Sequence, residues 1–108
     1  MNNNLVDNNQ DIVFYQDENG NFNIEVLIKN EDVWLNVNSI AKLFNVDRTG
    51  IIRHIANIYR DEELEESSTC AKIAQVQKEG NRKVTRVKEY YNLDMIISIG
   101  FLVRQRLS

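Results

Sequence analysis

Arg48, Thr49 and Arg53 lie close together at the start of a segment in which Ile51 and Ile55 recur at helical spacing. A guanidinium group can donate two parallel hydrogen bonds to O6 and N7 of guanine or to a phosphate, and a hydroxyl group can bond to either. Residues of these types at the start of a helix are typical of side chains that contact the DNA major groove. We therefore expect Arg48 and Thr49 to reach base edges and Arg53 to contact phosphate.

Two short helices are needed to position these side chains. The apolar spacing predicts a first helix over Val37–Phe44 with Asn36 as its N-cap, and a second helix over Arg48–Arg60 with Asp47 as its N-cap. Asn45 lies between them, and asparagine adopts a positive φ at lower cost than most residues. Two helices joined by a turn of this length are typical of a helix-turn-helix.

The same helix pair carries other residues that bear on this prediction. Lys42 is expected to contact phosphate, and Asn57 is expected to extend the DNA-contacting face. Gly50 either allows a close approach to phosphate or to the first helix, or is a neutral surface glycine. His54 is interpreted as a partly buried packing residue, with a phosphate or base contact as the alternative.

A hairpin is predicted after the helix pair. Residues 70–78 and 82–90 read as two strands, and residues 79–81 form the turn between them. On the first strand, the residues expected to face inward are Ala71, Ile73 and Val76.

The hairpin is basic, and its expected DNA-backbone contacts are Lys78, Arg82, Lys83 and Arg86. A basic hairpin that follows a helix-turn-helix is typical of a wing. The alternative is an ordinary exposed hairpin, because lysine on an edge strand protects it from pairing with other chains. The neighbouring helix pair favours the wing.

Three short strands are predicted before the helix pair. Residues 11–15 and 22–28 form a hairpin around the Asn-Gly dipeptide at 19–20, and residues 33–35 form a third strand. Trp34 is expected to pack against the first helix.

A last helix is predicted over residues 93–104, with Asn92 as its N-cap. It is apolar almost all round, whereas a surface helix has one polar face. The helix is therefore either central to the core or covered on one face by something else. Two things would cover that face: a partner subunit, in a homodimer through residues 93–104, or a further C-terminal region.

The elements together predict a single α+β domain over residues 11–108. Its parts in order are a β-hairpin, a helix-turn-helix, a β-hairpin wing and a C-terminal apolar helix, in a winged-helix-like arrangement. The Asn-rich residues 1–10 are expected to be a disordered tail. The acidic residues 61–69 are expected to be a solvated linker.

Charge is unevenly distributed along the 108 residues, although the formal net charge is only −3. Residues 1–35 carry seven acidic residues and one lysine, and residues 61–69 carry five acidic residues and no base. Residues 36–60 carry four bases and one acid, and residues 70–90 carry six bases and two acids. A basic face matters more for binding nucleic acid than the total charge does. The positive charge falls on the two segments predicted to contact DNA.

Several classes of protein are disfavoured by composition. One cysteine, Cys70, cannot form an internal disulfide, which is typical of a reducing cytoplasm. One histidine and one cysteine cannot build a metal site made of His and Cys ligands. The chain has no phosphate-binding glycine loop and no Ser/His/Asp arrangement, so we expect no enzyme and no cofactor. It has no apolar run of about 20 residues, so we expect no membrane span. We expect the first residues not to be a signal peptide, because they carry neither basic residues nor an apolar core.

Three stretches carry a resemblance to a known family: VWLNVNSIAKLFNVDRTGIIRHIANIYRDEEL, CAKIAQVQKEG and VKEYYNLDMIISIGFLVRQR. Over residues 12–106 the chain resembles the N-terminal part of the RhuM family of bacterial virulence-associated proteins. The resemblance implies kinship with the Bro-N and KilA-N type DNA-binding modules and a further region after this domain. It implies no catalytic residue. Members often have Ser or Thr where this chain has Gly50.

The residues and the resemblance lead to two functional hypotheses. The first is a cytoplasmic DNA-binding domain of a transcriptional regulator, which binds double-stranded DNA through the second helix and the basic hairpin. The second is a protein–protein interaction module that docks through the apolar helix at residues 93–104, with the acidic segments contributing.

Overall fold

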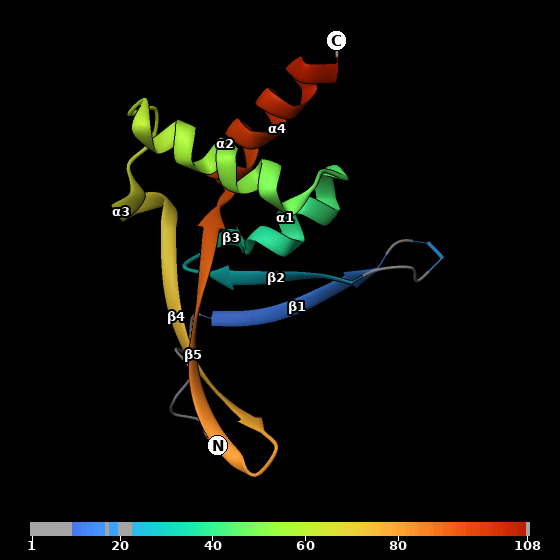
Figure 1. Cartoon of the computed structure of the whole chain (residues 1–108), viewed down its shortest axis with the longest axis vertical. Helices are drawn as coiled ribbons and strands as arrows, with labels where there is room; N and C mark the ends of the chain where they lie inside the picture. The colour runs from blue at the N-terminus through green and yellow to red at the C-terminus, as the bar shows by residue number, and fades with distance from the viewer. Residues whose placement is uncertain (1–9, 17, 20–22, 108) are drawn as a thin grey trace.

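The computed structural model describes residues 10–16, 18–19 and 23–107. It is an α+β fold in which these residues form five strands and four helices (Figure 1). In chain order they are β1 (Gln10–Gln16), β2 (Asn23–Lys29), β3 (Asp32–Leu35), α1 (Val37–Phe44), α2 (Arg48–Arg60), α3 (Glu66–Thr69), β4 (Cys70–Glu79), β5 (Arg82–Asn92) and α4 (Leu93–Leu107).

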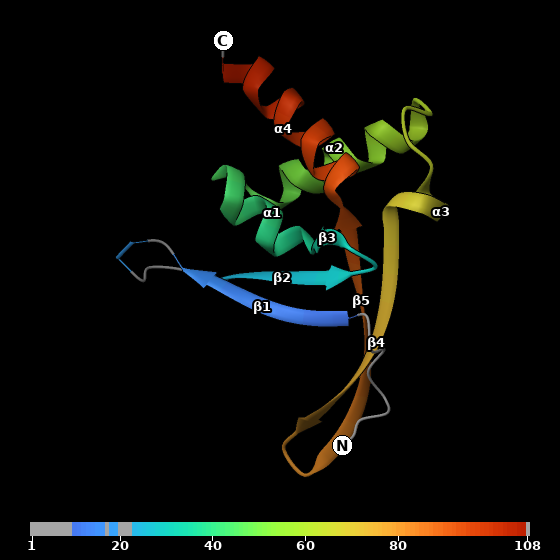
Figure 2. The same ribbon diagram turned by 180° about the vertical axis from the view of Figure 1, so that it is seen from behind.

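The strands form one antiparallel sheet in the order β1-β2-β3-β5-β4. The short strand β3 joins two long hairpins, and it pairs with β5 only through Trp34 with Asn92 and Leu35 with Tyr91. Figures 1 and 2 show that the β4–β5 hairpin runs along the long axis of the molecule, whereas β1 and β2 run across it. The helices lie together at one end of the long axis.

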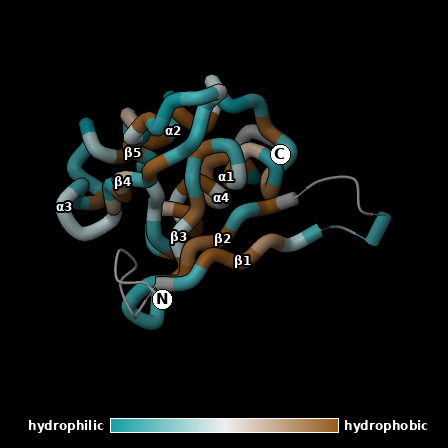
Figure 3. The backbone as a smooth tube through the Cα atoms, turned by 90° about the horizontal axis from the view of Figure 1, so that it is seen from below, coloured by the Kyte–Doolittle hydropathy of each residue, from teal (hydrophilic) through white to brown (hydrophobic). Residues whose placement is uncertain are grey.

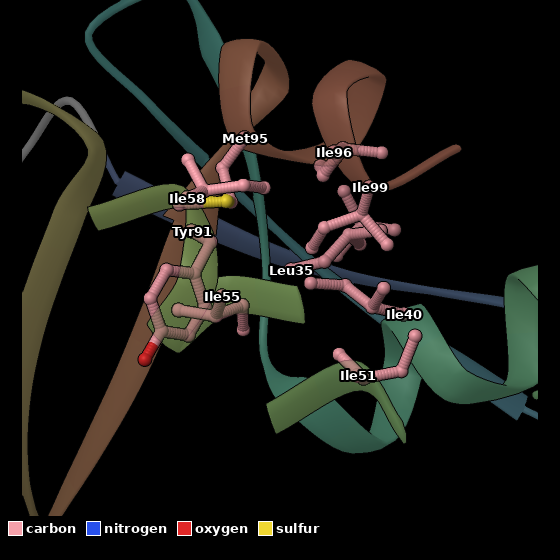
Figure 4. Close-up of a cluster of buried hydrophobic side chains, with 10 residues drawn as sticks. Leu35, Ile40, Ile51, Ile55, Ile58, Tyr91, Met95, Ile96 and Ile99 are labelled. Carbon is pink, nitrogen blue, oxygen red and sulfur yellow. The ribbon is translucent and has the colours of Figure 1, made fainter. Parts of the chain in front are cut away.

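The core lies where α1, α2 and α4 pack on the sheet (Figure 4). Its buried members are Val26, Leu35, Ile40, Ile51, Ile55, Ile58, Tyr91, Met95, Ile96 and Ile99. In Figure 3 the apolar segments of β1, β2 and β3 lie side by side. Alternation along β2 directs Ile24, Val26 and Ile28 to this core, as the sequence predicts; Phe22 lies outside the described residues.

Local side-chain chemistry sets the limits of the helix pair, and the structure confirms the predicted bounds of both helices. Asn36 accepts a hydrogen bond from the N–H of Ser39 at 2.8 Å, and Asp47 accepts one from Thr49 at 3.0 Å. Asn45 ends α1 with φ of 54°. In this left-handed conformation its N–H and that of Val46 bond to carbonyl groups of the last turn of α1.

Ser39, near the start of α1, makes the hydrogen bonds to β2 that a longer β3 would make. Strand β3 ends at Leu35, which pairs with Val26, so the backbone of Glu25 has no partner on β3. The buried Ser39 takes that place: its Oγ accepts a hydrogen bond from the N–H of Glu25 at 3.1 Å and donates one to its C=O at 2.9 Å. Ser39 therefore ties α1 to the sheet.

Three sequence predictions about side-chain placement are wrong. Trp34 does not pack against α1, because alternation along β3 directs Leu35 to the core; the indole N–H of Trp34 donates to the C=O of Lys29 at 3.2 Å. Val76 does not face inward but is 65% exposed, because alternation along β4 places it on the opposite face from Ala71 and Ile73. The segment 61–69 is not only a solvated linker: it contains α3, and Thr69 is buried with its Oγ1 2.8 Å from the hydroxyl oxygen of Tyr59.

The ends of six elements, the five strands and α4, differ from the prediction by one to three residues. Strand β1 begins at Gln10, which the sequence assigned to the tail, and the rest of that predicted tail lies outside the described residues. Helix α4 begins at Leu93 as predicted but continues to Leu107. Asn92 caps it, because its Oδ1 accepts a hydrogen bond from the N–H of Met95 at 3.2 Å. The predicted turn at residues 19–20 lies partly outside the described residues.

Candidate nucleic-acid interface

Helix α2 has one exposed face, and that face is basic. Arg48, Thr49 and Arg53 are all exposed, as is Arg60 near the end of the helix. The opposite face is buried through Ile51, His54, Ile55 and Ile58. Residues 48–60 include no acidic residue. The exposed face therefore presents guanidinium and hydroxyl donors to solvent without a carboxylate from its own helix.

Arg48 is oriented by a neighbouring residue of α1. Its Nε–H donates to Oδ1 of Asn38 at 2.9 Å. This bond uses one donor of the guanidinium group and leaves the two Nη groups to donate elsewhere. Thr49 lies beside it in the first turn, where its N–H is bonded to the Asp47 carboxylate. The hydroxyl of Thr49 is separate from that capping bond.

Lys42 and Asn57 lie at the edges of this face. Lys42 is exposed on α1 and lies near the start of α2, where it lines the same groove as Arg48. Asn57 is half-buried, and at about 100° per residue it lies on the flank of α2 opposite to Arg48. The structure therefore brings Lys42 together with Arg48 but places Asn57 away from both.

A groove of about 650 Å³ lies between the helix pair and the sheet. The start of α1, the first turns of α2 and the middle of β5 form its walls. Its cationic residues are Lys42, Arg48 and Lys88, and its acidic residues are Glu25 and Glu89. The groove exists because β3 is short, so that β2 and β5 diverge beyond the last pair between β3 and β5.

Two charged residues that line this groove, Glu25 and Lys88, belong to a polar cluster with Tyr90. The hydroxyl of the fully buried Tyr90 donates to Oε2 of Glu25 at 2.5 Å, and Nζ of Lys88 lies 3.9 Å from Oε1 of Glu25. Burial raises the pKa of Tyr90, and the hydrogen bond to the Glu25 carboxylate and its charge raise it further. Tyr90 therefore stays a neutral donor, and Glu25 holds together β2, β5 and, through its backbone, α1.

The four basic residues predicted for the hairpin are exposed, but they do not share one face. Lys78 and Lys83 are directly opposite each other across the strands, so their side chains lie on one face. Arg82 pairs with Glu79 and lies on the other face with Arg86. Within the described residues, no ion pair neutralises Lys78, Arg82 or Lys83.

Arg86 differs from the other three because its charge is matched inside the hairpin. Its Nε and Nη2 donate to the two carboxylate oxygens of Glu79 at 3.0 and 2.8 Å. This bond raises the pKa of the Arg86 guanidinium. A phosphate would have to compete with Glu79 for Arg86, so the uncompensated charge of the tip rests on Lys78, Arg82 and Lys83.

The hairpin tip and the face of α2 are separate regions of the surface. Figures 1 and 2 show the turn between β4 and β5 at the end of the long axis opposite to the helices. The upper part of β5 lies nearer to the helices, and Val87 and Lys88 line the groove with Arg48. Between the two cationic regions, the exposed apolar residues Val76 and Val87 follow the hairpin.

Sequence reasoning missed two apolar members of this surface. Ile52 is 44% exposed on α2 between Arg48 and Arg53, where its side chain could contact a thymine methyl group. Phe14 on β1 is exposed at the edge of the groove. Successive residues of a helix point about 100° apart, so Ile51 is buried while Ile52 is exposed. The sequence shows only two adjacent isoleucines and does not tell which of them is exposed.

Within the described residues, no three His, Cys, Asp or Glu side chains are grouped to hold a metal ion. Cys70 is half-buried, and burial raises the pKa of its thiol, so its thiolate form is disfavoured. His54 is buried in α2, more fully than the partly buried position that the sequence predicts. None of the helices in the described ranges is long and apolar enough to cross a membrane.

Comparison with known proteins identifies no relative: no family model, no curated protein and no solved structure matches the chain. The resemblance to RhuM proteins stays a prediction.

Proposed function

We propose that this chain is a DNA-binding domain that contacts the major groove with α2 and phosphates with the β4–β5 hairpin. The observation that carries the proposal is the exposed face of α2, where Arg48, Thr49 and Arg53 are presented by a capped helix that contains no acidic residue. The turn at Asn45 and the packing of α1 on α2 support a helix-turn-helix. A role as a transcriptional regulator is part of the same proposal.

Arg48 is the residue proposed to read bases. Its bond to Asn38 fixes the direction of the side chain, which reduces the conformational entropy lost on binding. The two Nη groups are then available for O6 and N7 of guanine. Ile52, one turn further on, adds an apolar contact that would favour thymine at a neighbouring position.

The hairpin is proposed to bind phosphate in the manner of a wing. Lys78 and Lys83 are like charges opposite each other, an arrangement that destabilises a strand pair. An anion between or beside them relieves this repulsion. The long hairpin places this charge far from α2, so the two regions would contact different parts of a duplex (Figure 1).

Selection from a pool of random duplex DNA at low and moderate salt tests the proposal. Enrichment of a short motif, with binding that weakens steeply as salt is added, is the expected result. No binding at low salt would overturn the proposal.

Three arginine variants of α2 then test the assignment of the face. Arg48→Gln is expected to reduce discrimination between the selected motif and random DNA, by about 1–3 kcal/mol. Arg53→Gln is expected to weaken binding to both DNAs equally. Arg60→Gln, at the far end of the same exposed face and with its Nε 3.5 Å from Oδ1 of Asp61, is expected to weaken binding to both DNAs less than Arg53→Gln does. Equal losses on both DNAs for Arg48→Gln would refute its base-reading role.

A further inference from the structure

Helix α4 has an uncovered face that carries a short ridge of four residues. Phe101 is 61% exposed and Ile97 is 60% exposed, and the charged residues Asp94 and Arg104 are exposed at either end. The spacings along Asp94, Ile97, Phe101 and Arg104 are three, four and three residues, so all four lie on one side of the helix. We call these four residues the α4 ridge.

The other side of α4 belongs to the core. Met95, Ile96 and Ile99 are buried there, and Leu102 and Val103 pack against the same cluster. Phe44 of α1 covers the surface at Gly100. Figures 1 and 2 show the C-terminal part of α4 extending beyond the other helices. The α4 ridge is thus the strip left uncovered after the domain has folded.

The α4 ridge is complementary to a second copy of itself that runs in the opposite direction. In that arrangement the acidic residue faces the basic one, and each apolar residue faces an apolar one. An acid, two apolar residues and a base follow each other at symmetric spacing. In an antiparallel pair of identical helices, Asp94 of one copy would meet Arg104 of the other at both ends. Ile97 would meet Phe101 twice in the centre. The distance between the two charges is the same in both helices, about 15 Å at 1.5 Å per residue.

We infer that the α4 ridge binds a second copy of this chain, as an antiparallel helix pair about a two-fold axis. A two-fold interface uses the same patch on both subunits, which a self-complementary ridge satisfies. Two ion pairs at the ends fix the register and the direction, because parallel pairing would place like charges together. The two central apolar pairs are removed from water. This inference does not depend on DNA binding.

Sedimentation equilibrium over a range of concentrations tests the inference directly. The 12.6 kDa chain is expected to reach twice that mass as its concentration rises through the micromolar range. Phe101→Glu is expected to abolish the association without unfolding the domain, because the side chain is mostly exposed. Glu63→Arg, a charge reversal at an exposed position away from α4, is the matched control and is expected to associate like the wild type.

Charge reversal distinguishes this arrangement from any other use of the helix. Asp94→Arg and Arg104→Asp alone are each expected to be monomeric, because each creates two like-charge contacts. An equimolar mixture of the two is expected to form heterodimers, since every contact then joins an acid and a base. The double variant Asp94→Arg with Arg104→Asp is expected to form homodimers again.

Three outcomes would overturn the inference. The wild type could remain monomeric at every concentration. This result would overturn the inference even if the α4 ridge were found to bind a different protein. Phe101→Glu could dimerise like the wild type, which would place the interface elsewhere. The mixture of the two single variants could remain monomeric while each is folded by circular dichroism, which would exclude antiparallel pairing in this register.

Discussion

The ring of Phe44, the last residue of α1, lies directly against Gly100 of α4. A methyl group added at Gly100 would lie 3.0 Å from Cζ and 3.1 Å from Cε1 of Phe44. Such distances are shorter than an ordinary contact between carbon atoms, about 3.5–4.0 Å. The glycine therefore allows the end of the helix pair to approach α4, and the placement of α1 depends on the absence of a side chain at residue 100.

The contact predicts strong coupling between the two positions. Replacing a glycine inside a helix with alanine normally stabilises it by about 1 kcal/mol. With Phe44 present, Gly100→Ala is expected to give no gain or a loss, because the new methyl group meets the ring. With Phe44→Leu, which lacks the Cε and Cζ atoms, Gly100→Ala is expected to be stabilising. Urea unfolding of the four proteins measures the difference.

The result is judged from the effect of Gly100→Ala in the two backgrounds. The free energy of unfolding is expected to change by about 0.5–1 kcal/mol more favourably in the Phe44→Leu background than in the wild type. Equal effects in both would show that the ring moves aside freely. Phe44 would then place no constraint on residue 100.

Helices α1 and α2 and the start of α4 were predictable because their limits are set by local interactions. Asn36, Asn45 and Asp47 act on backbone groups within a few residues, so their chemistry can be read from adjacent positions. The same holds for Asn92 at the start of α4. These caps explain why α1 and α2 have the predicted bounds.

What the sequence did not reveal depends on contacts between distant residues. Ser39 bonds to Glu25 and Tyr90 bonds to Glu25 across 65 positions, and neither pairing leaves a periodic signal. Helix α4 is apolar on both sides, so its sequence alone could not identify Ile97 as the exposed side. Likewise, the basic hairpin was predictable, but its direction away from α2 is set by the short pairing of β3 with β5.

Ser39→Ala is expected to destabilise the domain more than its size suggests. The change leaves the N–H and C=O of Glu25 without the partners that replace a strand. An unsatisfied buried polar group costs about 1–3 kcal/mol. Thermal and urea unfolding measure the loss. Ser98→Ala on α4 is the matched control and is expected to be neutral or slightly stabilising, because alanine is the better helix former. Equal effects of the two changes on the free energy of unfolding would show that the hydrogen bonds of Ser39 to Glu25 do not stabilise the domain.

Stability is expected to fall at alkaline pH because of one half-buried and two buried tyrosines, Tyr59, Tyr90 and Tyr91. Burial raises the pKa of Tyr59, Tyr90 and Tyr91 above the value of 10.0 that applies to the unfolded chain. The folded protein therefore keeps these protons at a pH where the unfolded chain releases them. The stabilisation is complete below about pH 10 and is lost as the pH rises further. Urea midpoints measured across this range, with absorbance of tyrosinate, follow the loss.

Tyr90→Phe tests the contribution of Tyr90 to this pH dependence. Removing its hydroxyl eliminates one proton that only the folded state retains. The decline in stability above about pH 10 is expected to be shallower in the variant. A slope for Tyr90→Phe as steep as that of the wild type would contradict the assignment.

The turn between β2 and β3 contains a residue in an unfavourable conformation. Asn30 and Glu31 have φ of 53° and 62°, which places both in the left-handed region. Asparagine tolerates this region, whereas for other residues with a side chain it costs roughly 1–2 kcal/mol. Glu31→Gly is therefore expected to raise the unfolding temperature, with a stabilisation of up to about 1 kcal/mol. Asn30→Gly should give a smaller gain, and a loss of stability in Glu31→Gly would contradict the conformational argument.

Lys83→Glu separates the structural from the binding role of the hairpin. In the folded protein Lys83 lies directly opposite Lys78, so the change converts a repulsive cross-strand pair into an attractive one. Stability is expected to rise by about 0.2–1 kcal/mol. Binding to DNA is expected to weaken on specific and random sequences alike, and the dependence of affinity on salt should become less steep. The effects on stability and on binding therefore have opposite signs.

A matched change on the same strand makes this prediction specific. Thr85→Glu adds the same negative charge two residues further along β5, opposite Val76, and is expected to weaken DNA binding less because it removes no cation. If Lys83→Glu stabilises the fold and leaves DNA affinity and its salt dependence unchanged, then Lys83 does not contact DNA. The hairpin would then be an ordinary exposed hairpin. The gain in stability shows that the hairpin is intact in the variant, so a loss of affinity can then be attributed to the missing cation.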